Sequence, residues 1–140
     1  HVLELSFGVD RNVWTLLDIH LTDERTGVLK LPPKLAPYTF AVFPLMKKDE
    51  LVPVAMKINS MLKDDYDVCY DQSGSIGKRY ARMDEIGTPF CITVDFDGLA
   101  DSTVTIRDTD TAEQKRVKVE DMGRIARGLA TGKLLFKDLN

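Results

Sequence analysis

The sequence predicts an α/β protein with a mixed five-stranded sheet flanked by three helices. From residue 38 onward, short apolar runs typical of buried strands alternate with amphipathic stretches typical of helices. That order favours parallel strands joined by right-handed crossovers. The last two strand patterns lie close together, and a hairpin there would make the sheet mixed. We expect a real core, because 44% of the 140 residues are hydrophobic and only 29% are charged.

The chain opens with a strand pattern that leads into a helix pattern. Apolar and polar residues alternate over 2–8, which predicts a strand with one apolar face. Residues 12–21 are apolar on nearly all sides, as in a helix buried within a larger structure. Residues 22–36 are polar and then proline-rich, so we expect an extended linker.

The elements of the predicted sheet domain follow in order. We expect strands over 38–45, 66–71, 90–97, 102–110 and 114–119, and helices over 49–63, 76–86 and 119–131. Asp49 is expected to cap the first of these helices, with Pro53 in its first turn. Gly87 and Pro89 are expected to end the second.

Composition and charge exclude several classes of protein. The net charge of −3 gives no global basic signal, so any contact with RNA must use a local patch. Cys69 and Cys91 lie in apolar strand patterns, which predicts buried thiols in a reducing compartment. No signal peptide and no run of 18 apolar residues is visible. We therefore expect a cytoplasmic protein.

A glycine-containing loop, SGSIGKR at residues 73–79, lies between a strand pattern and a helix pattern. Its spacing is not that of a P-loop, because only two residues separate the glycines and Arg79 follows the lysine. Two interpretations stay open. The helix N-terminus, with Lys78, Arg79 and Arg82, holds an RNA phosphate, or these side chains form a solvated basic face partly offset by Asp84 and its neighbour.

We expect neither a metal site nor a nucleophilic catalytic centre. The two histidines have no Cys or His neighbours at ligand spacing. Asp95, Asp97, Asp108 and Asp110 resemble a carboxylate cluster, but acidic residues at strand ends and hairpin turns usually serve as turn formers. No Ser-His-Asp or Cys-His pairing is evident.

The polar edge of the first predicted strand can hold a small ligand. Glu4 and Ser6 share a face about 7 Å apart, where they can hold a small cationic group. Gly8 leaves room for a ligand beside the backbone. Arg11 follows at the turn, where a guanidinium can stack on a base or pair with a phosphate. On chemistry alone, an edge strand without a ligand is an equal alternative.

Four stretches resemble class II aminoacyl-tRNA synthetases of the glycyl type, in their archaeal and eukaryotic form. LELSFGVDR resembles their third conserved motif, Glu-x-Ser-Phe-Gly-x-x-Arg. LPPKLAPYTFAVFPL, DQSGSIGKRYARMDEIGTPFCITVDFD and TVTIRDTDTAEQ resemble their C-terminal anticodon-binding domain. Leu5 stands where proline is common and Asp10 where glycine often occurs, but motifs 1 and 2 are absent altogether. The chain thus resembles the end of a catalytic core (1–31) followed by an anticodon-binding domain (32–140).

The resemblance implies ATP-dependent attachment of glycine to its tRNA, with ATP and Mg²⁺ as cofactors of the parent enzyme. Glu4 and Ser6 correspond to residues that bind the glycine substrate. Arg11, with Gly8 beside it, corresponds to the catalytic arginine that holds ATP. We expect this piece alone to bind no cofactor and to be inactive.

The resemblance also implies partners for the chain. These are the tRNA anticodon stem-loop, the rest of the catalytic core and, in the full-length enzyme, a second copy, with no membrane. Arg107 is the best candidate for the anticodon, because related domains often place an arginine on this strand. Lys78, Arg79 and Arg82 are weaker candidates. The alternative is a non-catalytic nucleic-acid-binding accessory module, as in the accessory subunit of mitochondrial DNA polymerase.

Overall fold

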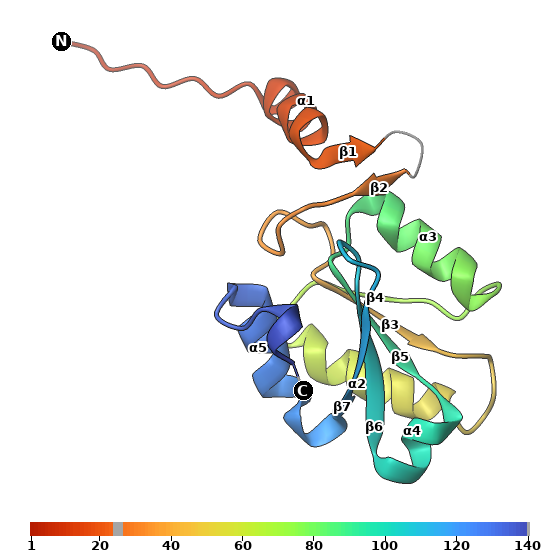
Figure 1. Cartoon of the computed structure of the whole chain (residues 1–140). Coiled ribbons are helices and arrows are strands. Elements are labelled where there is room, and N and C mark those ends of the chain that lie inside the picture. The colour runs from red at the N-terminus through yellow and green to blue at the C-terminus, as the bar shows by residue number, and fades with distance from the viewer. Residues whose placement is uncertain (24–26, 140) are drawn as a thin grey trace.

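The computed structural model describes residues 1–23 and 27–139 and confirms the predicted fold class (Figure 1). A five-stranded sheet has the order β4-β3-β5-β6-β7. Its strands are β3 (Phe40–Pro44), β4 (Val68–Tyr70), β5 (Phe90–Val94), β6 (Thr103–Asp108) and β7 (Gln114–Lys118). β3 pairs in parallel with β4 and β5, whereas β5, β6 and β7 pair antiparallel. The sheet is therefore mixed, and the predicted hairpin is β6–β7.

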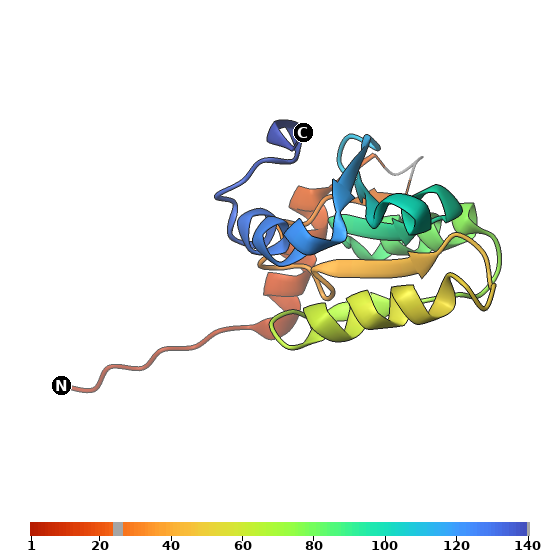
Figure 2. The same ribbon diagram turned by 90° about the horizontal axis from the view of Figure 1, so that it is seen from below.

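Helices cover both faces of this sheet. They are α2 (Val52–Lys63), α3 (Ile76–Ile86), α4 (Phe96–Asp101) and α5 (Met122–Thr131), with 3₁₀ turns at Val119–Asp121 and Phe136–Asp138. α2 lies along β3, as Figure 2 shows from below. α2 and α5 share one face, and α3 packs on the opposite face.

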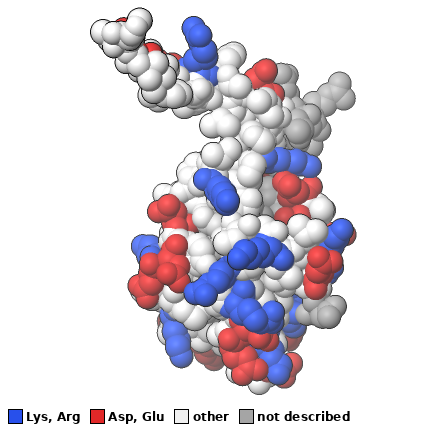
Figure 3. Space-filling view, turned by 90° about the vertical axis from the view of Figure 1, so that its left-hand side faces the viewer, with Lys and Arg blue, Asp and Glu red and all other residues white. Residues whose placement is uncertain are grey.

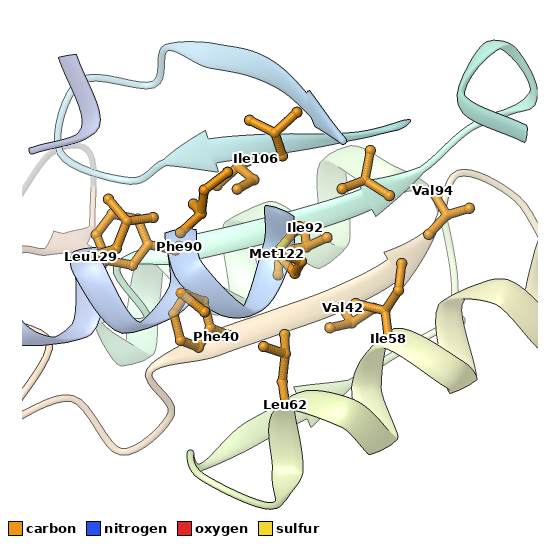
Figure 4. Close-up of a cluster of buried hydrophobic side chains, with 14 of the residues drawn as sticks. Phe40, Val42, Ile58, Leu62, Phe90, Ile92, Val94, Ile106, Met122 and Leu129 are labelled. Atoms are coloured by element: carbon orange, nitrogen blue, oxygen red, sulfur yellow. The ribbon is translucent and has the colours of Figure 1, made fainter. Parts of the chain in front are cut away.

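The main core lies between the sheet and the pair α2 and α5 (Figure 4). Phe40 and Ile92 point from the strands toward Ile58 and Leu62 of α2 and Met122 of α5. All five side chains are buried. The helical spacing of apolar residues in α2 and the alternation in the strands therefore produce one continuous apolar interior.

The second face of the sheet is covered unevenly. Ala41 and Phe43 of β3 and Cys91 of β5 pack against Met83 of α3. On β6 and β7 the same face carries polar side chains that stay partly exposed. This part of the sheet is open at the surface, and it sets the position of the candidate site.

The N-terminal segment departs from prediction. Residues 2–8 form no strand, and the segment reaches away from the body of the molecule (Figure 1). A strand needs a neighbour for its backbone hydrogen bonds, and no described residue pairs with it. α1 (Val9–His20) is a helix, as expected, but it starts earlier than predicted and none of its residues is buried. The larger structure in which this helix was expected to be buried is not part of the described residues, so that expectation stays a prediction.

Other predicted boundaries need correction as well. The expected linker contains a small hairpin of β1 (Leu21–Asp23) and β2 (Val28–Leu29), although residues 24–26 of it lie outside the described residues. Asp49 does not cap α2, because the helix begins later and its N-cap makes no side-chain hydrogen bond. The strand predicted to run to residue 97 ends at Val94, and α4 follows it. No helix among the described residues is both long and apolar enough to cross a membrane.

Candidate nucleic-acid interface

A line of polar side chains crosses the open part of the sheet face. Strand register places Arg107 opposite Cys91, and Thr105 opposite both Thr93 and Arg116. Residues directly opposite in a pair share a face, so these side chains stand side by side. We call this set the polar strip: Tyr80, Asp84, Thr93, Asp95, Thr105, Arg107 and Arg116.

Arg107 lies on the face of β6 turned away from the main core, as the alternation of Val104 and Ile106 with Thr105 and Arg107 predicts. Its guanidinium donates to both carboxylate oxygens of Asp84, with N···O distances of 2.8 and 3.2 Å. The two side chains are only 12% and 15% exposed. Arg107 therefore pairs across the sheet face with α3, and not with the neighbouring carboxylates Asp108 or Asp110. Asp108 instead accepts hydrogen bonds from Thr111 within the turn.

Aromatic packing holds the Arg107 fork in place. The guanidinium carbon lies 5.0 Å from the centre of the Tyr80 ring. The Tyr80 hydroxyl in turn lies 2.7 Å from the Thr93 hydroxyl. Burial raises the pKa of Tyr80 and raises that of Cys91 to about 12. Cys91 therefore stays a protonated, unreactive thiol beneath the strip.

A second arginine–carboxylate pair lies at the other end of the polar strip. Arg116 donates to both oxygens of Asp95 at 3.0 and 2.6 Å. Asp95 also caps α4 by accepting from the Gly98 backbone at 2.7 Å. The hydrogen bonds from Arg116, more than the cap, lower the pKa of Asp95. Sequence reasoning missed Arg116, although the alternation in β7 places it on the same face as Arg107.

Two of the predicted basic residues, Arg82 and Lys78, lie near the loop after β4 and make different contacts. Arg82 binds the Asp71 carboxylate and donates to the Ser73 carbonyl at 3.0 Å. Burial alone would raise the pKa of Asp71, but hydrogen bonds from Ser73 and Arg82 lower it. Arg82 therefore stabilises the conformation of the loop through Asp71 and Ser73, whereas the Lys78 side chain is exposed.

Arg79 does not belong to an accessible basic face. Its side chain is 1% exposed. The guanidinium donates to the carbonyl oxygens of Pro44, Leu45 and Asp71 at 2.5, 3.0 and 3.4 Å. These bonds tie the end of β3 to the loop after β4. The structure therefore removes Arg79 from the side chains that a phosphate could reach.

The predicted glycine and ATP residues are not brought together. Glu4, Ser6, Gly8 and Arg11 are all exposed, and the first three lie in the extended N-terminal segment. A side chain at Gly8 would meet only the Arg11 Cβ within 4 Å. No other described residue supplies a second wall for a ligand, so this geometry does not fit ATP or Mg²⁺, and we derive no chemical step through them.

Positive charge gathers in the C-terminal part of the chain. Residues 114–140 contain seven Lys and Arg but only three Asp and Glu, whereas the whole chain is acidic. Arg116, Lys118 and Arg124, together with Asp121 and Asp138, line one hollow of about 390 Å³ between β7 and α5. Figure 3 views the side on which α5 lies, where basic side chains cross the middle and acidic ones lie to either side. This surface supplies the local basic patch that the net charge does not show.

Comparison with known proteins identifies the family. The family described as "Anticodon binding domain" matches residues 39–128, which include every residue of the polar strip. This chain belongs to that family. The predicted resemblance to the anticodon-binding domain is thereby confirmed.

Several curated relatives are similar to the chain over most of its length. Glycine–tRNA ligases of Borreliella afzelii and Rhodopirellula baltica are 49% and 51% identical over 128 and 132 residues, which is 87% of this chain but 29% and 25% of theirs. The glycine–tRNA ligase of Pyrococcus horikoshii is 48% identical over 135 residues, 94% of this chain and 24% of its own. The chain thus spans about a quarter of the length of these relatives.

Proposed function

We propose that this chain supplies tRNA anticodon recognition to a glycine–tRNA ligase, which attaches glycine to its tRNA using ATP. One observation carries the proposal: the family match contains the whole polar strip, which runs from the edge of α3 across β5 and β6 to the exposed Arg116 of β7. The relatives named above are all glycine–tRNA ligases, which favours a ligase over a non-catalytic accessory module.

In the proposed complex, the unpaired bases of the anticodon loop lie on the polar strip. Single-stranded bases are recognised by hydrogen bonds to their edges and by stacking on aromatic rings or guanidinium planes. Arg107 and Arg116 supply donors and planar surfaces for both. Arg116 and Lys118, which the register of β7 places on the face of the strip, together with Lys78, provide charge for the phosphates, which position the RNA.

We further propose that residues 1–31 belong to the catalytic core and that 32–140 form the anticodon-binding domain. In the parent enzyme, Glu4 and Ser6 bind glycine, and Arg11 beside Gly8 binds ATP. These residues act only with the remainder of a core that supplies the other walls and Mg²⁺. The proposed enzyme is a cytoplasmic homodimer, and the 140-residue chain alone makes no glycyl-adenylate.

Arg107→Ala tests the anticodon proposal. The 140-residue chain is titrated with the anticodon stem-loop of a glycine tRNA. We expect the variant to lose about 1–3 kcal/mol of binding free energy, because a fork of donors to a base edge is gone. Lys57→Ala is the control, since Lys57 is exposed on α2 beyond the other face of the sheet. Equal binding by all three proteins would contradict the proposal.

A further inference from the structure

The two edges of the five-stranded sheet are protected to different degrees. β7 carries Lys115, Arg116 and Lys118, and the Lys115 ammonium also donates to the Lys137 carbonyl of the C-terminal segment at 2.6 Å. Charged side chains, above all lysine, and a covering segment are the usual features that prevent another strand from adding to an edge. β4 has the sequence Val-Cys-Tyr and carries no charge. The β4 edge therefore remains open to a further strand.

The backbone of β4 supplies hydrogen-bonding groups on its outer side. On the inner side, the Asp67 carbonyl accepts from the Thr39 amide at 2.9 Å, and the Asp71 amide donates to β3 at 3.4 Å. Alternate residues of a strand face the same neighbour, so Val68 and Tyr70 present their N–H and C=O groups away from β3. Among the described residues, β3 is the only strand that pairs with β4.

Two hollows lie next to this outer side. The lining of the first, of about 460 Å³, includes all three residues of β4 together with Tyr38, Tyr66 and Asp67. The second, of about 340 Å³, shares Tyr66 and Asp67 with the first and adds Asp65. Because β4 is only three residues long, it can form few backbone hydrogen bonds with an added strand. Side chains held in these hollows must therefore contribute to recognition.

We propose that the β4 edge binds an extended, basic peptide segment of a protein partner, which adds to the sheet as a further strand. In this mode of recognition, backbone hydrogen bonds supply affinity and pockets for alternate side chains supply specificity. The inference goes beyond the proposed function and does not depend on it, because the polar strip ends at β7, on the opposite edge of the sheet.

Charge determines the chemistry of the partner. Residues 63–71 contain four Asp and one Lys. Arg82 neutralises Asp71, which leaves three exposed carboxylates, those of Asp64, Asp65 and Asp67. Lys and Arg side chains of a partner can pair with these carboxylates and pack on tyrosine rings. The same carboxylates repel the phosphates of RNA. The extended residues 2–8 of a second copy contain a glutamate and no Lys or Arg, so they fit the edge poorly.

Synthetic peptides test the proposal. The probe is a short peptide in which valine alternates with lysine and arginine, and it is titrated calorimetrically against the 140-residue chain. We expect this peptide to bind, and a peptide with glutamate at the basic positions not to bind. Two further peptides are N-methylated, one at the valines and the other at the basic residues. Only one of these two should lose binding, because every second amide of a strand faces its neighbour.

Variants of the chain locate the binding site. Tyr70→Pro removes an outward N–H and leaves the bonds to β3, whereas Tyr70→Ala removes the same ring and keeps the N–H. We expect the proline variant to bind the basic peptide roughly 2- to 10-fold more weakly than the alanine variant. Asp65→Asn combined with Asp67→Asn should weaken binding by up to about 10-fold. Glu50→Gln is the matched control, since Glu50 is exposed at the other end of α2 and should bind normally.

Circular dichroism melting shows which variants fold. If Tyr70→Pro does not fold, the N-methylated peptides and the aspartate variant decide. The inference is overturned if the basic peptide does not bind, if the acidic peptide binds equally well, or if both N-methylated peptides bind as tightly as the unmodified one. Self-association of the chain that Tyr70→Pro abolishes would assign the edge to a second copy instead. Displacement of the peptide by an anticodon stem-loop would place it on the polar strip, which also contradicts the proposal.

Discussion

Residues 1–20 and the sheet domain both carry apolar patterns, but only the apolar side chains of the sheet domain are buried. Trp14 in α1 is 74% exposed, whereas Phe40 in β3 is fully buried. α1 forms all the same, because the hydrogen bonds of a helix lie within one segment. The strand expected over 2–8 does not form, because a strand needs a neighbour. An apolar pattern thus predicts which side chains of a segment can be buried. They are buried only where neighbouring strands or helices pack against that segment.

Core truncation should separate the two regions most sharply. Ile92→Ala is expected to lower the free energy of unfolding by about 2–5 kcal/mol, since the side chain is fully buried between strands and helices. Ile19→Ala, at a side chain 62% exposed on α1, should change it by less than about 0.5 kcal/mol. Urea unfolding followed by circular dichroism measures both. Similar losses would mean that α1 is packed in solution.

Two deletions should show where the N-terminal region ends and the sheet domain begins. Removing residues 1–20 is expected to leave the melting transition unchanged. Removing 1–31 should cost about 1.5–3 kcal/mol, because Leu29 is buried and β2 packs on α3. The remainder should still fold and be at least as soluble. If the longer deletion unfolds it, the boundary that we propose after residue 31 is wrong.

Acid should weaken the sheet domain through two carboxylates, which is the smallest effect. The pKa values of Asp71 and Asp95 are lowered in the folded chain. Their stabilisation is therefore present above the unfolded value of about 3.9 and is lost as the pH falls below it. Arg116→Gln should reduce this acid loss by about 0–1 kcal/mol, since the Arg116 side chain is 40% exposed.

The acid measurement has a simple check. Thermal melts of wild type and Arg116→Gln are compared at neutral pH and near pH 3. The gap between the two proteins should narrow at low pH. A gap that stays constant would show that Asp95 titrates normally.

Most of the sheet domain could be predicted from the sequence, because its signals are local. The bounds of α3 match the prediction at both ends, and Gly87 ends that helix in the left-handed conformation. α4 was missed because it is short and contains a glycine. A side chain at Gly98 would come within 2.2 Å of the Thr103 carbonyl oxygen, a contact that only the folded chain reveals.

The candidate site was only half predictable. Alternation along β6 placed Arg107 on the correct face. Its partner Asp84 lies on α3, and no local pattern joins residues that only the fold brings together. The prediction that Arg79 belongs to an accessible basic face was wrong for the same reason. Its neighbours Lys78 and Arg82 indicated a surface cluster, but α3 places the Arg79 side chain in the interior.

The buried Arg79 also excludes ligands from one position in this fold. In open α/β sheets, ligands usually enter a crevice at the carboxyl ends of the strands, where neighbouring connections leave toward opposite faces. Here β3 leads to α2 on one face and β4 leads to α3 on the other. The guanidinium of Arg79 fills that point and satisfies carbonyls from both strand ends. A buried side chain therefore occupies the position at which nucleotides bind in other open α/β sheets. The proposed RNA site lies instead on the face of the sheet.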